Sequence, residues 1–260
     1  MKQWKEVRND EALWARIAGS PQKALILDYD GTLAPFVQDR NQAVPYPGVR
    51  EIVSKIMRRP GSRVVFVTGR ACEDLLSLLD LPVCPEVWGS HGGERLLPDG
   101  TLEKASLGPE HARGLASARE KAGSLGDERL EEKPGCVAAH FRGLDEHRAG
   151  KLKQEIFAAW SGTAKESGLT LHEFDGGLEL RVPGADKGRA VRKILEETGH
   201  GAVVFYLGDD TTDEDAFLAL KGKGTPVLVR KEPRPTQAEW LLKPPEELLE
   251  FLSQWDAALA

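Results

Sequence analysis

The chain has 260 residues, of which 40% are hydrophobic and 29% charged, a composition that excludes disordered and fibrous proteins and allows one large or two modest domains. Its formal net charge of −6 argues against a nucleic-acid or anionic-membrane partner, because such binding depends on clustered lysine and arginine. A local basic pocket for a small anion is compatible with this charge, and no segment approaches the roughly 18 apolar residues that span a bilayer.

The cysteines and the first residues of the chain indicate the cellular compartment in which we expect the protein. Cys72, Cys84 and Cys136 are odd in number and lie in no metal-type pair, so we expect free thiols in a reducing environment. Residues 1–6 are polar and lack the apolar core of a signal peptide. We therefore expect a soluble, cytoplasmic protein.

Apolar strands alternate with amphipathic helices over the first hundred residues. In chain order we predict a helix over 9–18 capped by Asn9 or Asp10, a strand from 24 to 28, a helix over 49–57, a strand over 63–67, a helix over 73–79 and a strand entering a loop over 86–93. This order predicts a parallel, doubly wound sheet of the Rossmann-like type.

The pattern changes after residue 107 and returns at residue 183. Between these points we predict a charged helix over 111–121, half-buried strands over 135–142 and 169–181, and an amphipathic helix over 152–160. After them we predict a helix over 188–197, strands over 202–207 and 226–229, and a closing helix over 245–259. We therefore expect an α/β fold in which a core of residues 1–107 and 183–260 carries a smaller inserted domain, 108–182.

Two aspartates follow the first predicted strand, in Asp28-Tyr29-Asp30-Gly31-Thr32-Leu33. Ligands of open α/β sheets bind beyond the carboxyl ends of the strands, and residues i and i+2 of a strand share a face. Asp28 is then a candidate nucleophile that forms an aspartyl-phosphate, with Asp30 as its proton shuttle. A tight hairpin at Asp30-Gly31 is the main alternative, and a calcium loop is disfavoured because glycine stands fourth rather than sixth.

Other polar residues also follow predicted strands or begin helices. Asp209, with Asp210 and Asp213 nearby, supplies carboxylates for a Mg²⁺ ion, which phosphoryl transfer commonly uses to neutralise charge. Thr68 and Lys187 offer a hydroxyl and a positive charge to a phosphoryl group. The alternatives are a helix cap at 210–213, a local turn at Thr68 and a solvated lysine. No Walker loop and no GxGxxG motif follows a strand, which disfavours kinases and dinucleotide enzymes.

The motifs DYDGTL, TGR, ADKG and GDDTTDEDAF occur in the order typical of the haloacid dehalogenase superfamily. DYDGTLAP together with the GDDxTDE form of the last motif resembles the trehalose-6-phosphate phosphatase family over nearly the whole chain. The resemblance implies a haloacid dehalogenase core with an inserted cap domain. It also implies Asp28 as nucleophile, Asp30 as acid and base, Thr68 and Lys187 as phosphate ligands, and Mg²⁺ on Asp28, the Asp30 carbonyl and Asp209.

The same resemblance implies residues that bind the sugar. In the inserted segment, LEEK followed by HFR and the later GLELR are similar to the family's cap pattern. They imply a set of sugar contacts to which Arg70 and His91 are added from the core: Glu131, Lys133, His140, Arg142 and Glu179. For His140 and Arg142 the alternative is a polar residue on the open face of a sheet. Pro134 departs from the pattern just after Lys133.

These features favour a Mg²⁺-dependent phosphatase acting on trehalose 6-phosphate, with a functional link to a trehalose-6-phosphate synthase. The nearest alternative is a phosphatase for another glycosyl phosphate, such as sucrose phosphate or glucosylglycerol phosphate. A phosphomutase is a further alternative, and a non-catalytic sugar-phosphate sensor would not need the nucleophile. A dehalogenase needs neither the second aspartate nor the metal, and a transport ATPase needs a membrane domain.

Overall fold

The computed structural model describes Trp4 and residues 10–37, 39–174 and 176–260. These residues divide into two compact units, which we call the core unit (1–102 with 186–260) and the inserted unit (103–185). The domain boundaries expected at 107 and 183 stay a prediction. Within the described ranges, no helix is both long and apolar enough to cross a membrane.

An eight-stranded sheet organises the core unit, with the order β12-β11-β10-β1-β2-β3-β4-β5. The strands are β1 (Lys23–Leu27), β2 (Ser62–Val67), β3 (Glu86–Gly89), β4 (Glu94–Leu96), β5 (Leu102–Lys104), β10 (Val203–Gly208), β11 (Thr225–Val229) and β12 (Trp240–Leu242). Of β5, only Leu102 falls in the core unit. Pairing is parallel from β12 to β3, and β4 runs antiparallel to β3. Because β1 pairs in parallel with both neighbours, the hairpin alternative at Asp30-Gly31 is wrong.

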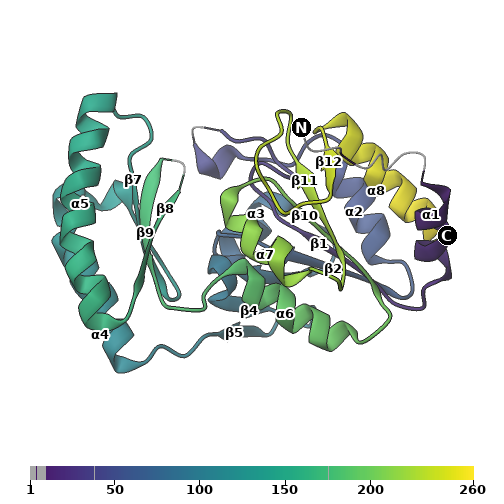
Figure 1. Cartoon of the computed structure of the whole chain (residues 1–260), viewed down its shortest axis with the longest axis horizontal. Coiled ribbons are helices and arrows are strands. Elements are labelled where there is room, and N and C mark those ends of the chain that lie inside the picture. The colour runs from purple at the N-terminus through teal and green to yellow at the C-terminus, as the bar shows by residue number, and fades with distance from the viewer. Residues whose placement is uncertain (1–3, 5–9, 38, 175) are drawn as a thin grey trace. The chain divides into compact units, whose positions relative to one another are not determined.

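Helices cover both faces of this sheet (Figure 1). One face carries α1 (Glu11–Gly19), α2 (Val49–Met57), α3 (Cys72–Leu79) and α8 (Glu246–Ala258), and the other carries α6 (Lys187–Thr198) and α7 (Glu214–Ala219). In β1, Leu25 and Leu27 pack on the first group, whereas Ala24 and Ile26 pack on the second. Because both faces of β1 are buried, its sequence shows no alternation of polar and apolar residues. The predicted doubly wound α/β sheet is confirmed.

The inserted unit is an antiparallel sheet with the order β6-β7-β9-β8, packed on two helices (Figure 1). Its elements are α4 (Pro109–Lys121), β6 (Leu130–Lys133), β7 (Cys136–His140), α5 (Glu146–Ser167), β8 (Thr170–Phe174) and β9 (Gly177–Arg181). Val137, Ala139, Leu178 and Leu180 pack with the helices. The side chains that alternate with them therefore lie on the opposite face of the sheet.

Several predicted elements differ from the observed ones. The single strand expected over 169–181 is wrong, because β8 and β9 pair with each other in antiparallel register. The helix expected over 152–160 extends over the whole of α5, from a cap at Asp145 to a left-handed Gly168. Asp10 caps α1, while Asn9 lies outside the described residues.

Short 3₁₀ turns complete the connections. They are η1 (Arg40–Gln42), η2 (Ser90–Gly92), η3 (Gly123–Leu125), η4 (Asp127–Arg129) and η5 (Thr211–Asp213). In η2, Ser90 and His91 have positive φ angles of 52° and 54°, and the chain reverses there from β3 into β4. The strand that was expected to enter a loop within 86–93 therefore ends at Gly89.

Candidate active site

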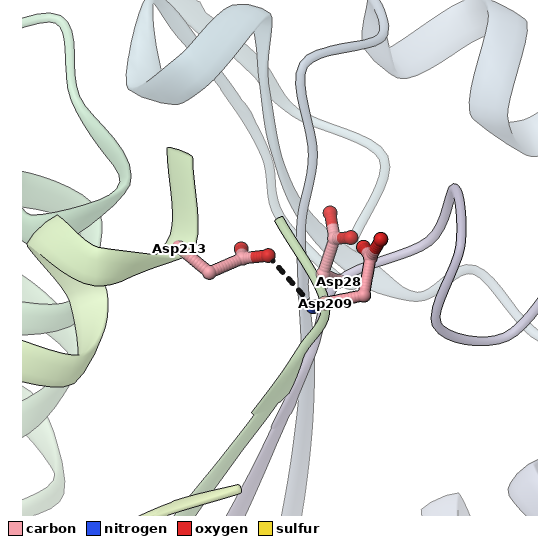
Figure 2. Close-up of side chains that lie close together, drawn as sticks. All are labelled: Asp28, Asp209 and Asp213. Carbon is pink, nitrogen blue, oxygen red and sulfur yellow. Dashed lines mark hydrogen bonds between the residues drawn. The ribbon is translucent and has the colours of Figure 1, made fainter. Parts of the chain in front are cut away.

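The carboxyl ends of β1 and β10 place two aspartates side by side. Asp28 follows the last residue of β1 and continues the ladder, since its N–H donates to the Leu207 carbonyl at 2.9 Å. Asp209 follows the last residue of β10. Figure 2 shows both carboxylates directed beyond the strand ends, while Asp213 approaches from the segment after β10. One carboxylate oxygen of each of these three residues lies within 4.8 Å of the others.

Lys187 joins two of these acids. Its Nζ donates to Asp28 Oδ1 at 2.6 Å and to Asp213 Oδ1 at 2.7 Å, and all three side chains are buried. Lys187 is the first residue of α6, whose N-cap Asp186 accepts a hydrogen bond from the Arg189 N–H. The alternative of a solvated lysine is therefore wrong.

Asp213 has no lone pair left for a metal ion. Its Oδ1 accepts hydrogen bonds from Lys187 and from the Tyr206 hydroxyl, the latter at 2.7 Å. Its Oδ2 accepts the backbone N–H groups of Asp209 and Asp210, each at 2.9 Å. Asp210 and Asp213 also form a capping box, so the cap alternative is correct for this pair. Asp213 thus holds the turn that carries Asp209, whereas Asp28 and Asp209 keep oxygens available for a cation.

Three buried carboxylates face the Lys187 ammonium group, and the half-exposed Arg230 guanidinium adds a longer ion pair of 4.0 Å to Asp209 Oδ2. Burial, opposed by Lys187 and reinforced by Asp213, raises the pKa of Asp28 to about 7. Burial and the neighbouring Asp28 raise the pKa of Asp209 well above its ordinary value. Carboxylates of this kind gain from a divalent cation, which removes the repulsion that opposes their ionisation.

Gly31 and Thr32 lie against the carboxylates of Asp28 and Asp209, although neither residue was predicted from the sequence to belong to the site. The Thr32 hydroxyl lies 3.3 Å from Asp28 Oδ2 and 3.4 Å from Asp209 Oδ1, so it can donate to either carboxylate. Gly31 has φ of +83°, and a Cβ on it would lie 2.3 Å from Asp209 Oδ2. Only glycine fits both this conformation and this close approach. The signal was present as the Gly-Thr that follows Asp30.

Asp30 and Arg70 form a pair of their own. Arg70 donates from Nε to Asp30 Oδ2 at 2.7 Å and from Nη2 to Asp30 Oδ1 at 2.6 Å. The buried guanidinium also donates to the Arg40 carbonyl and lies 5.5 Å from the centre of the Tyr29 ring. Arg70 was expected to contact sugar. That role stays a prediction. In the structure Arg70 pairs with Asp30, the residue expected to act as acid and base.

Thr68 and His91 lie next to Arg70 in the core unit. Thr68 Oγ1 accepts the Arg70 N–H at 3.1 Å, which is the local turn given as its alternative. The His91 N–H donates to the Thr68 carbonyl at 3.0 Å, and the His91 ring lies where a Cβ on Gly69 would fall. Both side chains are buried. Their predicted roles toward phosphate and sugar are compatible with these contacts but remain predictions.

The inserted unit carries most of its expected sugar contacts on one face. Glu131, Ala138 and Glu179 are neighbours in the ladder of β6, β7 and β9, so their side chains project from the face opposite the helices. Glu131 lies 3.0 Å from Lys133 Nζ and 2.9 Å from His140 Nε2.

Glu179 and Arg142 complete the set of the inserted unit. Glu179 accepts a hydrogen bond from Cys136 Sγ at 2.9 Å and pairs with Arg181 at 3.2 Å. Arg142 lies beyond the end of β7, against Gly176. The structure thus brings Glu131, Lys133 and His140 together, while the contact of each residue with sugar stays a prediction.

Comparison with known proteins identifies relatives over most of the chain. The family model described as trehalose-phosphatase matches residues 26–246. A trehalose-phosphate phosphatase of Mycobacterium ulcerans is 30% identical over 255 residues, covering 92% of this chain and 63% of the relative. Trehalose-phosphate phosphatase B of Arabidopsis thaliana is 32% identical over 261 residues, covering 91% of this chain and 67% of the relative. This chain therefore spans about two thirds of their length.

Solved structures support the fold. The C-terminal domain of the C. albicans trehalose-6-phosphate phosphatase superposes with a TM-score of 0.82 at 21% identity, covering 98% of this chain and 99% of that one. At this identity the likeness concerns the fold alone. The site itself is supported by the buried aspartates at the ends of β1 and β10.

Proposed function

This chain belongs to the trehalose-phosphatase family, and from this premise we propose that it hydrolyses trehalose 6-phosphate to trehalose and phosphate. The observation that carries the proposal is the buried Asp28, which lies at the end of β1 between the Lys187 ammonium group and the Asp209 carboxylate. Phosphoryl transfer through an aspartyl-phosphate requires a nucleophile, a positively charged group and a second carboxylate at the same edge of the sheet. Asp28, Lys187 and Asp209 are these three groups in the proposal.

Asp28 is the nucleophile of the proposed mechanism. One of its carboxylate oxygens forms a bond to phosphorus as the bond from phosphorus to the sugar oxygen breaks, and Asp30 acts as the general acid that supplies the proton to that leaving oxygen. Asp30 then takes a proton from a water molecule, which attacks the same phosphorus and releases Asp28. Lys187 holds Asp28 Oδ1 at 2.6 Å and orients the attacking carboxylate. Together with Thr68 it contacts the phosphoryl oxygens.

The residues present fit a Mg²⁺ ion. Asp28 and Asp209 offer hard oxygen ligands in a buried place with excess negative charge, and the family resemblance adds the Asp30 carbonyl. Bound Mg²⁺ supplies positive charge to the phosphoryl oxygens. Asp213 orients Asp209 through the backbone N–H and does not ligate the ion, because its own oxygens are occupied.

We assign recognition of the sugar to the polar residues expected from the family: Arg70, His91, Glu131, Lys133, His140, Arg142 and Glu179. Acidic and basic side chains suit a substrate rich in hydroxyl groups, because a site built on such hydrogen bonds discriminates strongly against analogues that lack them. A trehalose-6-phosphate synthase is the expected source of the substrate. The three free cysteines support a reducing, cytoplasmic location.

The proposal is tested by measuring phosphate release from a panel of sugar phosphates in the presence of Mg²⁺. We expect trehalose 6-phosphate to have the highest kcat/KM, ahead of sucrose phosphate and glucosylglycerol phosphate. Asp28→Asn should remove activity toward every ester while the protein stays folded, because an amide oxygen is a poor nucleophile. A higher kcat/KM for another member would overturn the assignment of substrate, and an active Asp28→Asn variant would overturn the nucleophile.

A further inference from the structure

The turn of residues 209–213, which carries Asp209, is held through its backbone from one side by Asp213. Both backbone N–H groups of Asp209 and Asp210 donate to Asp213 Oδ2 at 2.9 Å. These bonds fix the amide side of the turn. On the carbonyl side, the Asp210 carbonyl accepts the Asp213 N–H at 3.0 Å, and the Asp209 carbonyl accepts a longer bond of 3.5 Å from Arg230 Nη1. A carbonyl oxygen has two lone pairs, so each of these groups can accept a further donor.

Arg234, in the segment that follows β11, donates to both of these carbonyl groups. Its Nε donates to the Asp209 carbonyl at 3.0 Å, and its Nη2 donates to the Asp210 carbonyl. The Arg234 side chain is only 14% exposed. A planar guanidinium with its donors in a fixed fork can hold two successive carbonyl groups in one orientation, which a lysine cannot do.

Glu214, the first residue of α7, holds Arg234 in place. It pairs with Arg234 Nη1 at 2.5 Å and accepts a hydrogen bond from the Thr236 hydroxyl at 2.6 Å. Its other oxygen accepts the Gln237 N–H at 2.8 Å. The segment 234–237 is thus tied to the start of α7, and Arg234 is fixed before any ligand arrives.

We propose that Arg234 is a positioning residue for the metal ligand Asp209. With Asp213 on the amide side and Arg234 on the carbonyl side, the backbone of the turn has one orientation, and the Asp209 carboxylate points toward Asp28 before the cation binds. The inference rests on the proposed function, because it takes Asp209 as a ligand of Mg²⁺. Without Arg234, ordering the turn costs part of the free energy of cation binding, so the affinity of the site for the cation falls.

The test measures binding of Mn²⁺, a spectroscopic substitute for Mg²⁺, by counting the free ion with electron paramagnetic resonance. We expect Arg234→Met to weaken Mn²⁺ binding about 10- to 100-fold, as is usual when partners of metal ligands are lost. Arg234→Lys should recover part of the affinity, because an ammonium group can hold one of the two carbonyl groups. The measurement needs neither substrate nor turnover.

Arg95→Met is the matched control. Arg95 is 13% exposed and pairs with Glu86 and Glu197, so its loss removes a comparable ion pair without touching the turn. We expect it to lower the thermal unfolding temperature as much as Arg234→Met does, while Mn²⁺ binding stays at the level of the original protein.

Two sets of results overturn the proposal. The first is Mn²⁺ binding by Arg234→Met equal to that of the original protein, or no Mn²⁺ binding by the original protein. The second is equal weakening in Arg95→Met, which would show a global effect. If trehalose 6-phosphate is not hydrolysed but the metal affinities follow the expected order, the substrate assignment fails and the role of Arg234 stands.

Discussion

Lys187 Nζ lies 2.6 Å from Asp28 Oδ1, although the two residues are 159 positions apart in the chain. The contact joins the first turn of α6 to the end of β1, so Asp28, the proposed nucleophile, and the Lys187 ammonium group meet only when the sheet has formed. Burial alone would lower the pKa of Lys187, but Asp213 and Asp28 outweigh it and raise the pKa, which keeps the ammonium group charged. The pair therefore stabilises the folded site and, in the proposed mechanism, orients the attacking carboxylate.

We predict that Lys187→Met destabilises the metal-free protein by about 3 kcal/mol, because removing one partner of a buried ion pair leaves charges uncompensated. Activity should fall at least about 100-fold for loss of an electrostatic contact to the reacting group. Urea unfolding and phosphate release measure these two effects. Lys193→Met is the control on the same helix, since Lys193 is half-exposed and its nearest acid lies at 3.8 Å. A change below about 1 kcal/mol in Lys187→Met would contradict the role of the pair.

Replacement of Gly31 should separate backbone strain from the close approach to Asp209. Gly31→Ala and Gly100→Ala both place a side chain at a positive φ, +83° and +87°, which costs about 1–2 kcal/mol in each case. Only at Gly31 does the new Cβ meet another group, Asp209 Oδ2 at 2.3 Å, whereas nothing lies within 4 Å at Gly100. We therefore expect both variants to be destabilised in thermal unfolding and only Gly31→Ala to lose Mn²⁺ binding. Retained binding in Gly31→Ala would refute this geometry.

A pH dependence of stability is expected from Glu197. Burial opposes ionisation of Glu197, but hydrogen bonds from Arg95 and Arg63, both at 2.7 Å, outweigh it and lower the pKa from 4.5. Because the folded-state pKa lies below the unfolded value, the stabilisation is complete above about pH 4.5 and is lost as the pH falls through the lowered value. Glu197→Gln should therefore destabilise the protein at pH 7 by about 0.5–1 kcal/mol.

The measurement is urea unfolding of Glu197→Gln and the original protein between pH 3 and pH 8. The difference in free energy of unfolding should shrink below pH 4.5 and vanish at the acid end. Glu196→Gln provides the control, because the Glu196 side chain is 71% exposed and lies 3.9 Å from Lys193. A difference that persists unchanged at pH 3 would show that Glu197 acts through packing rather than charge.

Elements with a local signal could be predicted from the sequence. The apolar residues 24–27 of β1 and the helical apolar stripe of α2 were recognised because strand and helix periodicities involve neighbours a few positions apart. Burial of Lys23 at the start of β1 and the Asp186 cap of α6 were not predicted. The position of the aspartates after β1 and β10 could also be inferred from the sequence, because the carboxyl ends of parallel strands lie at the same edge of a sheet. Short strands such as β6 and β12 were missed, because three or four residues show too little periodicity.

The pairing of the polar groups at the site could not be predicted from local sequence patterns. Asp30-Gly31 has the local signature of a hairpin, and parallel pairing of β1 with β2 and β10 overrides it. Asp213 was expected near Asp209 as a helix cap or as a support for the metal ligand, but only the structure shows the four hydrogen-bond donors that occupy its oxygens. Arg70 meets Asp30 across 40 positions and Arg234 meets Asp209 across 25. Such contacts depend on long-range packing, which no local pattern of residues encodes.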